Sequence, residues 1–126
     1  MTSEEERRKE VIENAVLIAA ESLFKQPESF FKVVDIIRTD YGYTCHVCVN
    51  APTLYLHLPI EDIITAEASI AHVKVHPDME KGEFRLEFLF NCAKIGENAL
   101  FKFTKCFYVV RISDELKPQI KSIFKN

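Results

Sequence analysis

The sequence predicts a single α+β domain over residues 1–126, with a long N-terminal helix packed on a curved antiparallel sheet of five to six strands and a C-terminal helix. Apolar residues recur at helical spacing near both ends of the chain. Between these ends, apolar and polar residues alternate, and short turn signals separate the alternating runs. The length is that of one domain. A barrel of six or seven strands capped by the last helix is the alternative arrangement.

The N-terminal helix is expected over residues 3–25, because Ser3 can cap it and acidic residues fill its positive first turn. Gln26 and Pro27 end it. Its apolar positions repeat every three to four residues and widen in the second half until they almost surround the helix. They are Val11, Ile12, Ala15, Val16, Ala19, Ala20 and Leu23. An apolar face this wide predicts that the sheet curls around the helix.

Strands are expected in the middle of the chain, at residues 30–38, 43–49, 54–58, 69–76, 83–92 and 99–112. The segments between them contain Gly, Pro, Asn or Asp, which favour turns. No helix is available as a crossover, so neighbouring strands should pair antiparallel. Residues 59–67 leave two interpretations, a helical turn that begins at Pro59 or a bend between two strands.

The last residues predict a second helix, which Ser113 can cap. Its apolar residues, Leu116, Ile120, Ile123 and Phe124, fall on one face. Because Pro118 lacks a backbone N–H, the regular part of this helix should begin nearer Lys117.

Composition and charge exclude several function classes. The net charge of −3 gives no positive field to attract nucleic acid, so no nucleic-acid partner is expected. The apolar run behind the charged N-terminus is too short to span a membrane and lacks the layout of a signal peptide. We therefore expect a cytoplasmic protein whose 4 cysteines are free thiols.

Cys45 and Cys48 form a CxxC pair, yet the alternation of their strand places them on opposite faces of a sheet, too far apart for one ion or one disulfide. A redox CxxC motif lies at the start of a helix, and no helix is expected after Cys48. A zinc finger with His72 and His76 is also disfavoured. Twenty-three residues separate Cys48 from His72, where the finger pattern has about twelve. Both histidines also lie in one strand, about 13 Å apart.

A metal site is better placed by pairing the strands at 43–49 and 54–58 as a hairpin. Residues 50–53 would form its loop, which sets His46 opposite His57 and Cys48 opposite Tyr55 on the outward face. Neutral imidazole is a good transition-metal ligand. His46, His57 and Cys48 are therefore the candidate metal ligands, and the alternative is that they are solvated residues of the sheet.

The last predicted strand is apolar on both faces, which is typical of a strand covered on both sides. Helices would cover one side, and either a partner chain or the C-terminal helix the other. The candidate interface residues are Tyr55, Leu100, Tyr108 and Val110.

No catalytic set or nucleotide-binding motif is present, and the 3 glycines each fit a turn. We therefore expect a non-enzymatic binding or adaptor domain that acts through its sheet surface or an edge strand, with a protein partner or as a homodimer. The alternative is a small-ligand or metal-binding protein that uses a cavity between helix and sheet, or the His46/His57/Cys48 site. A cavity above about 300 Å³ lined by phenylalanines would favour this alternative.

Overall fold

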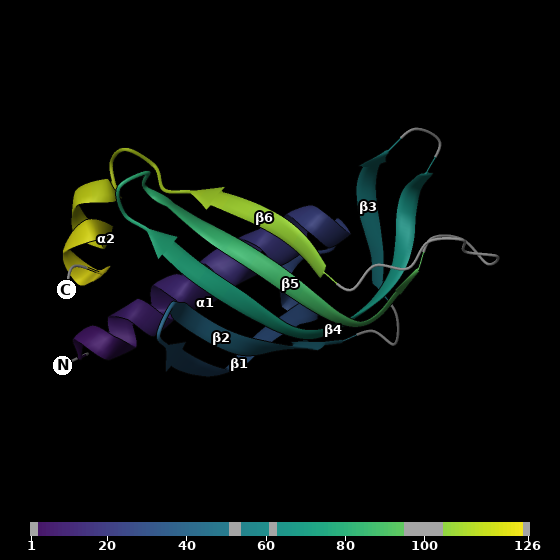
Figure 1. Ribbon diagram of the computed structural model, residues 1–126, viewed down its shortest axis with the longest axis horizontal. Helices are drawn as coiled ribbons and strands as arrows, with labels where there is room; N and C mark the ends of the chain where they lie inside the picture. Colours follow the sequence, from purple (N-terminus) through teal and green to yellow (C-terminus); the bar gives the residue numbers. More distant parts are fainter. Residues whose placement is uncertain (1–2, 51–53, 61–62, 95–104, 125–126) are drawn as a thin grey trace.

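A long helix, α1 (Glu4–Phe24), lies across one face of an antiparallel sheet, and a short helix, α2 (Lys117–Phe124), lies beside its N-terminal half (Figure 1). The computed structural model describes residues 3–50, 54–60, 63–94 and 105–124. The strands are β1 (Phe31–Thr39), β2 (Gly42–Val49), β3 (Leu54–Ile60), β4 (Ile63–Asp78), β5 (Glu83–Lys94) and β6 (Lys105–Arg111), and a short 3₁₀ helix, Glu28–Phe30, precedes β1. The predicted α+β architecture is confirmed.

Both helices begin where the sequence predicts. The side chain of Ser3 caps α1 by accepting a hydrogen bond from the backbone N–H of Glu6, at 3.1 Å. The helix ends when Lys25 adopts the left-handed conformation (φ 54°) and its N–H bonds to the carbonyl of Glu21. The regular part of α2 starts at Lys117, directly before the proline.

The strands follow the order β1-β2-β4-β5-β6, and β3 pairs with β4 outside this path. Because β5 occupies one edge of β4, both β2 and β3 lie along its other edge. Tyr43 of β2 pairs with Val75 near one end of β4, and Leu54 of β3 pairs with Ala68 nearer the other. Figure 1 shows the β3 end of β4 bending away from the rest of the sheet.

The predicted hairpin between residues 43–49 and 54–58 is therefore wrong. Strand β4 is 16 residues long, twice the predicted length, and can pair with two short strands in succession. Only residues 61–62 separate β3 from β4, so β3 pairs back on β4, in the tight-hairpin manner. Residues 59–60 and 63–67 belong to β3 and β4, so the helical turn predicted from Pro59 does not form, and residues 61–62, where a bend would lie, are outside the described residues.

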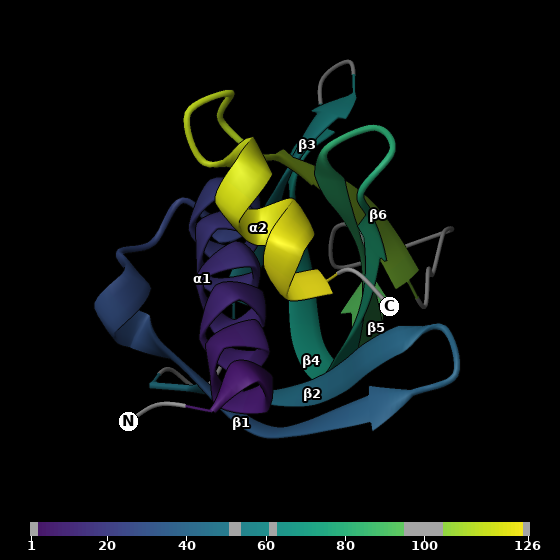
Figure 2. The ribbon, with the colours of Figure 1, turned by 90° about the vertical axis from the view of Figure 1, so that its left-hand side faces the viewer.

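The core lies between α1 and the concave face of the sheet, which curves around the helix (Figure 2). Phe24 stacks its ring edge against Phe88 of β5, with centroids 6.4 Å apart, and also contacts Phe31 of β1, at 5.9 Å. The predicted inward residues of β5 are all buried: Phe84, Leu86, Phe88 and Phe90. Cys45, Val73 and Val75 are buried as well, as their alternation predicts.

Helix α2 lies on the same side of the sheet as α1. Its Phe124 packs edge-on against Tyr43 and Phe84, whose rings point inward. Arg8 of α1 donates a hydrogen bond from Nε to the carbonyl of Ile123, at 2.7 Å, and so provides a partner for a carbonyl in the last turn of α2. Within the described residues, no helix covers the convex face of β6.

Neither α1 nor α2 is both long enough and apolar enough to cross a lipid bilayer.

Candidate functional site

Strand β6 presents apolar side chains to the outside of the sheet. Its exposure alternates along the strand, with Phe107 66% and Val109 44% exposed. Lys105 and Arg111 lie at the two ends of the same face, and Lys105 places its Nζ 5.8 Å from the Phe107 ring. Burying the Phe107 ring against a partner would contribute about 1.5–3 kcal/mol.

None of the predicted interface residues that the structure describes lies on the outward face of β6 with Phe107 and Val109. Tyr108 and Val110 are half-buried on the inner face, where they pack against the core. Tyr55 belongs to β3 and pairs in register with Glu67, and Leu100 lies outside the described residues. That any of these four contacts a partner stays a prediction.

Sequence reasoning missed Phe107 and Val109, although a signal was present. Side chains two positions apart lie on the same face of a strand, so Lys105 and Arg111 share a face with Phe107 and Val109. The charged residues at both ends of this face indicate that it points outward. Choosing the interface face by this criterion would have selected Phe107 and Val109.

The two ends of the sheet differ. Strand β6 pairs only with β5 among the described residues, and its register runs without a shift from Lys105 to Arg111. At the other end, β1 is interrupted between Val34 and Ile37, where Asp35 takes a positive φ of 52°. Bulges and charges are devices that prevent edge strands from pairing with other chains. The irregularity at Asp35 therefore protects β1 from pairing with another chain, whereas β6 is regular and apolar at its centre.

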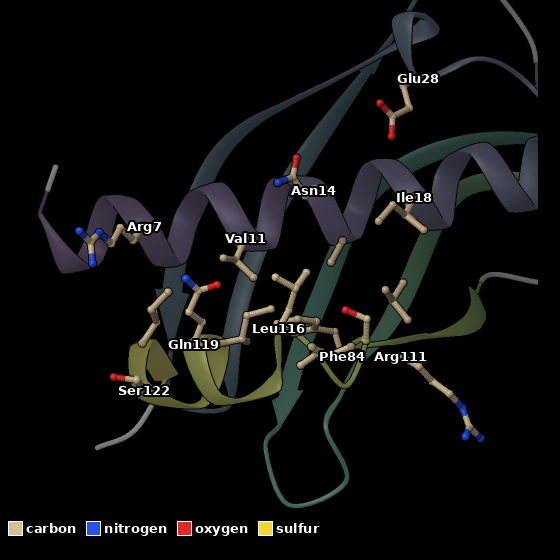
Figure 3. Close-up of a pocket in the computed structure, with 16 residues that line it drawn as sticks. Arg7, Val11, Asn14, Ile18, Glu28, Phe84, Arg111, Leu116, Gln119 and Ser122 are labelled. Carbon is tan, nitrogen blue, oxygen red and sulfur yellow. The ribbon is translucent and has the colours of Figure 1, made fainter.

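An open groove of about 910 Å³ lies between α1, α2 and the C-terminal end of β6 (Figure 3). Its apolar lining includes Val11, Ile18, Val110 and Leu116, and Gln119 reaches from α2 toward α1. Ile18 and Leu116 are 46% and 49% exposed. A cavity lined by phenylalanines would favour small-ligand binding, but Phe84 is the one phenylalanine that lines the groove within the described ranges.

His46 lies on the outward face of β2, and its neighbour is another histidine. The ring of His72, from β4, has its centroid 6.3 Å from that of His46, with the ring planes inclined at 44°. His57 instead pairs in register with Thr65 of β4, because β3 does not pair with β2. The structure thus brings His46 together with His72, and the hairpin that led us to predict His46 opposite His57 does not form.

Cys45 and Cys48 point to opposite faces of the sheet, so they do not form one site. Cys45 is buried, which raises the pKa of its thiol to about 12, whereas Cys48 is exposed opposite Lys32 of β1. Within the part of the chain that the structure describes, no three His, Cys, Asp or Glu side chains are grouped closely enough to hold a metal ion.

Tyr43 carries a buried hydroxyl without a hydrogen-bond partner in the described residues. Burial raises the pKa of this phenol. It borders a small polar hollow of about 310 Å³ together with Arg8 and Arg38. Glu5 lies within 3.0 Å of Arg8 and 3.7 Å of Arg38, and this carboxylate already supplies the arginines with a counter-ion.

Comparison with known proteins gives no match: no protein family describes this chain, and neither curated proteins nor solved structures contain a significant relative.

Proposed function

We propose that the protein is a small intracellular, non-enzymatic binding domain that takes up an extended segment of a partner protein along β6. The observation that carries the proposal is the exposed pair Phe107 and Val109 on a regular strand at the end of the sheet. An added strand forms main-chain hydrogen bonds along such an edge, while its alternate side chains contact the outward apolar residues.

The charges of β6 favour a partner other than a second copy of the chain. If two copies paired antiparallel with full overlap about Tyr108, Lys105 of each would face Arg111 of the other. Like charges directly opposite one another destabilise a strand pair. A partner strand with acidic residues at these two positions and apolar residues between them would complement the face instead.

This proposal is tested with a display library of extended peptides in which two apolar residues, at alternate positions, are flanked by Asp or Glu. Enriched peptides are then titrated by fluorescence anisotropy against the wild type and the double variant Phe107→Ser/Val109→Ser. We expect the double variant to lose at least about tenfold in affinity, since a partner that buries the Phe107 ring gains about 1.5–3 kcal/mol from it.

Ile37→Ser is the matched control, because Ile37 is 59% exposed on β1, the protected end of the sheet. It should bind the peptides as the wild type does. Wild-type affinity in the double variant would contradict the proposal. Sedimentation equilibrium of the wild type measures self-association separately, and a dimer that Phe107→Ser dissociates would identify the second copy as the partner.

A second candidate function, small-ligand binding, is favoured by the groove between α1 and α2. Its volume of about 910 Å³ lies within the range of ligand pockets, about 300–1,000 Å³. The mixture of an apolar lining with amide and hydroxyl groups suits an amphipathic molecule. The groove is open, and Phe84 is the one phenylalanine among its described lining residues, so this candidate is weaker than the β6 proposal.

The groove is tested by titrating the protein with an anilinonaphthalene sulfonate dye, whose fluorescence rises in apolar surroundings. We expect the double variant Ile18→Ser/Leu116→Ser to bind the dye at least about fivefold more weakly, since two apolar side chains that line the groove are removed. Ile37→Ser again serves as a control of equal chemistry outside the groove. Equal dye affinities in the three proteins would exclude the groove as the apolar binding site.

A further inference from the structure

We propose that His46 of β2 and His72 of β4 form a two-histidine site for a divalent transition-metal ion on the convex face of the sheet. The site is independent of partner binding at β6. Cys45 pairs directly with Val73 in the antiparallel ladder, so the next position along each strand sets His46 opposite His72. Both side chains point away from the core, because Cys45 and Val73 are buried.

The distance between the rings suits one shared ion. With metal–nitrogen bonds of about 2.1 Å, two imidazoles on a tetrahedral ion have their centroids about 5 Å apart. The observed separation is 6.3 Å, and a small rotation of either side chain closes the difference. His46 is exposed, and within the described residues no hydrogen bond or ion pair restrains either ring.

The chemistry of the two ligands selects the class of ion. Imidazole nitrogens favour Cu²⁺, Ni²⁺ and Zn²⁺, whereas Mg²⁺ and Ca²⁺ require oxygen ligands. The nearest charged residue along β4, Lys74, is two positions from His72, and it pairs in register with Glu87. Among the described residues no Asp, Glu or Cys side chain is grouped with the two histidines, so water would complete the coordination of the ion.

Two other histidines provide internal comparisons. His76 lies on the same face of β4 but four residues from His72, a separation of about 13 Å along a strand. Its Nδ1 lies 3.1 Å from the carbonyl of Tyr41, so it already has a partner. His57 belongs to β3, which pairs with a different part of β4. Neither should take part in the site.

The experiment is isothermal titration calorimetry of the untagged full chain with NiCl₂ in a buffer without chelating components. We expect His46→Ala and His72→Ala each to weaken Ni²⁺ binding by roughly 100-fold, because the second imidazole binds intramolecularly at high effective concentration. The double variant His46→Ala/His72→Ala should lose no more affinity for Ni²⁺ than either single variant. His76→Ala, His57→Ala and Cys48→Ser should bind Ni²⁺ as the wild type does.

Wild-type affinity in His46→Ala or His72→Ala would overturn the proposal, and so would a comparable loss in His76→Ala, His57→Ala or Cys48→Ser. A thermal melt distinguishes loss of ligands from loss of fold. Without metal, all variants should melt near the wild type, since both histidines lie outside the core. Added Ni²⁺ should raise the Tm of the wild type and of His76→Ala, but leave that of His46→Ala unchanged.

Discussion

Replacement of Phe88 by alanine is expected to lower the free energy of unfolding by about 3–5 kcal/mol, the usual cost of removing a buried phenyl ring. Phe88 is fully buried at the centre of β5, and its ring meets Phe24 of α1. The substitution removes the contact that joins the helix to the middle of the sheet and leaves a cavity that the surrounding backbone cannot fill. A domain near the lower end of the usual range, about 5–15 kcal/mol, would then be close to unfolding at physiological temperature.

Urea denaturation followed by circular dichroism measures this loss. The matched control is Phe107→Ala, which removes the same ring from the neighbouring strand on the exposed face. Surface substitutions usually change stability by less than about 0.5 kcal/mol, so the two variants should differ several-fold in effect. Equal losses would mean that the concave face of β5 is not the core.

The second large effect is expected at Gly42, which opens β2 directly after the turn from β1. Its φ is +149°, and a Cβ added there would clash with the carbonyl oxygen of Val75, an atom held in the ladder between β2 and β4. Gly42→Ala therefore strains the backbone and separates two paired strands. We expect it to lower the free energy of unfolding by at least about 3 kcal/mol, because the clash adds to the roughly 1–3 kcal/mol that a strained backbone costs alone.

Gly82→Ala provides the comparison, because Gly82 also has a positive φ, of 66°. A Cβ at that position would meet the end of the flexible Lys117 side chain, which can move aside. Its cost should be limited to that of the left-handed backbone, about 1–2 kcal/mol. Thermal melts of both variants rank the two effects, and a Gly82→Ala protein less stable than Gly42→Ala would refute the steric explanation.

Local sequence patterns were sufficient to predict the elements of this fold and the direction of most side chains. Ser3, the strand alternation around Cys45 and the run from Phe84 to Phe90 each depend on residues within a few positions of one another. Capping and alternation are short-range physics, and the structure confirms them.

Strand partners could not be predicted in the same way, because pairing depends on residues far apart in the chain. The apolar alternation of β2 fits a hairpin with β3 as well as it fits the ladder with β4, since either choice buries Cys45 and Val47. What decides between them is the length of β4. The sequence therefore identified His46 as a residue to examine but assigned it the wrong neighbour, and His72 emerged only from the three-dimensional structure.

The use of β4 by two strands also has a consequence for how the chain folds. Each of the pairs β1–β2, β3–β4, β4–β5 and β5–β6 joins strands that follow one another in sequence, so these contacts close short loops. Among the strand pairs of the described residues, the pairing of β2 with β4 is the one that skips a strand in the sequence. Across small domains the folding rate falls as the mean sequence separation of the contacts rises, because the entropy of closing the longer loop is lost first. The rate at which the sheet assembles should therefore depend mainly on the moment when β2 meets the far half of β4, the same event that brings the two histidines together.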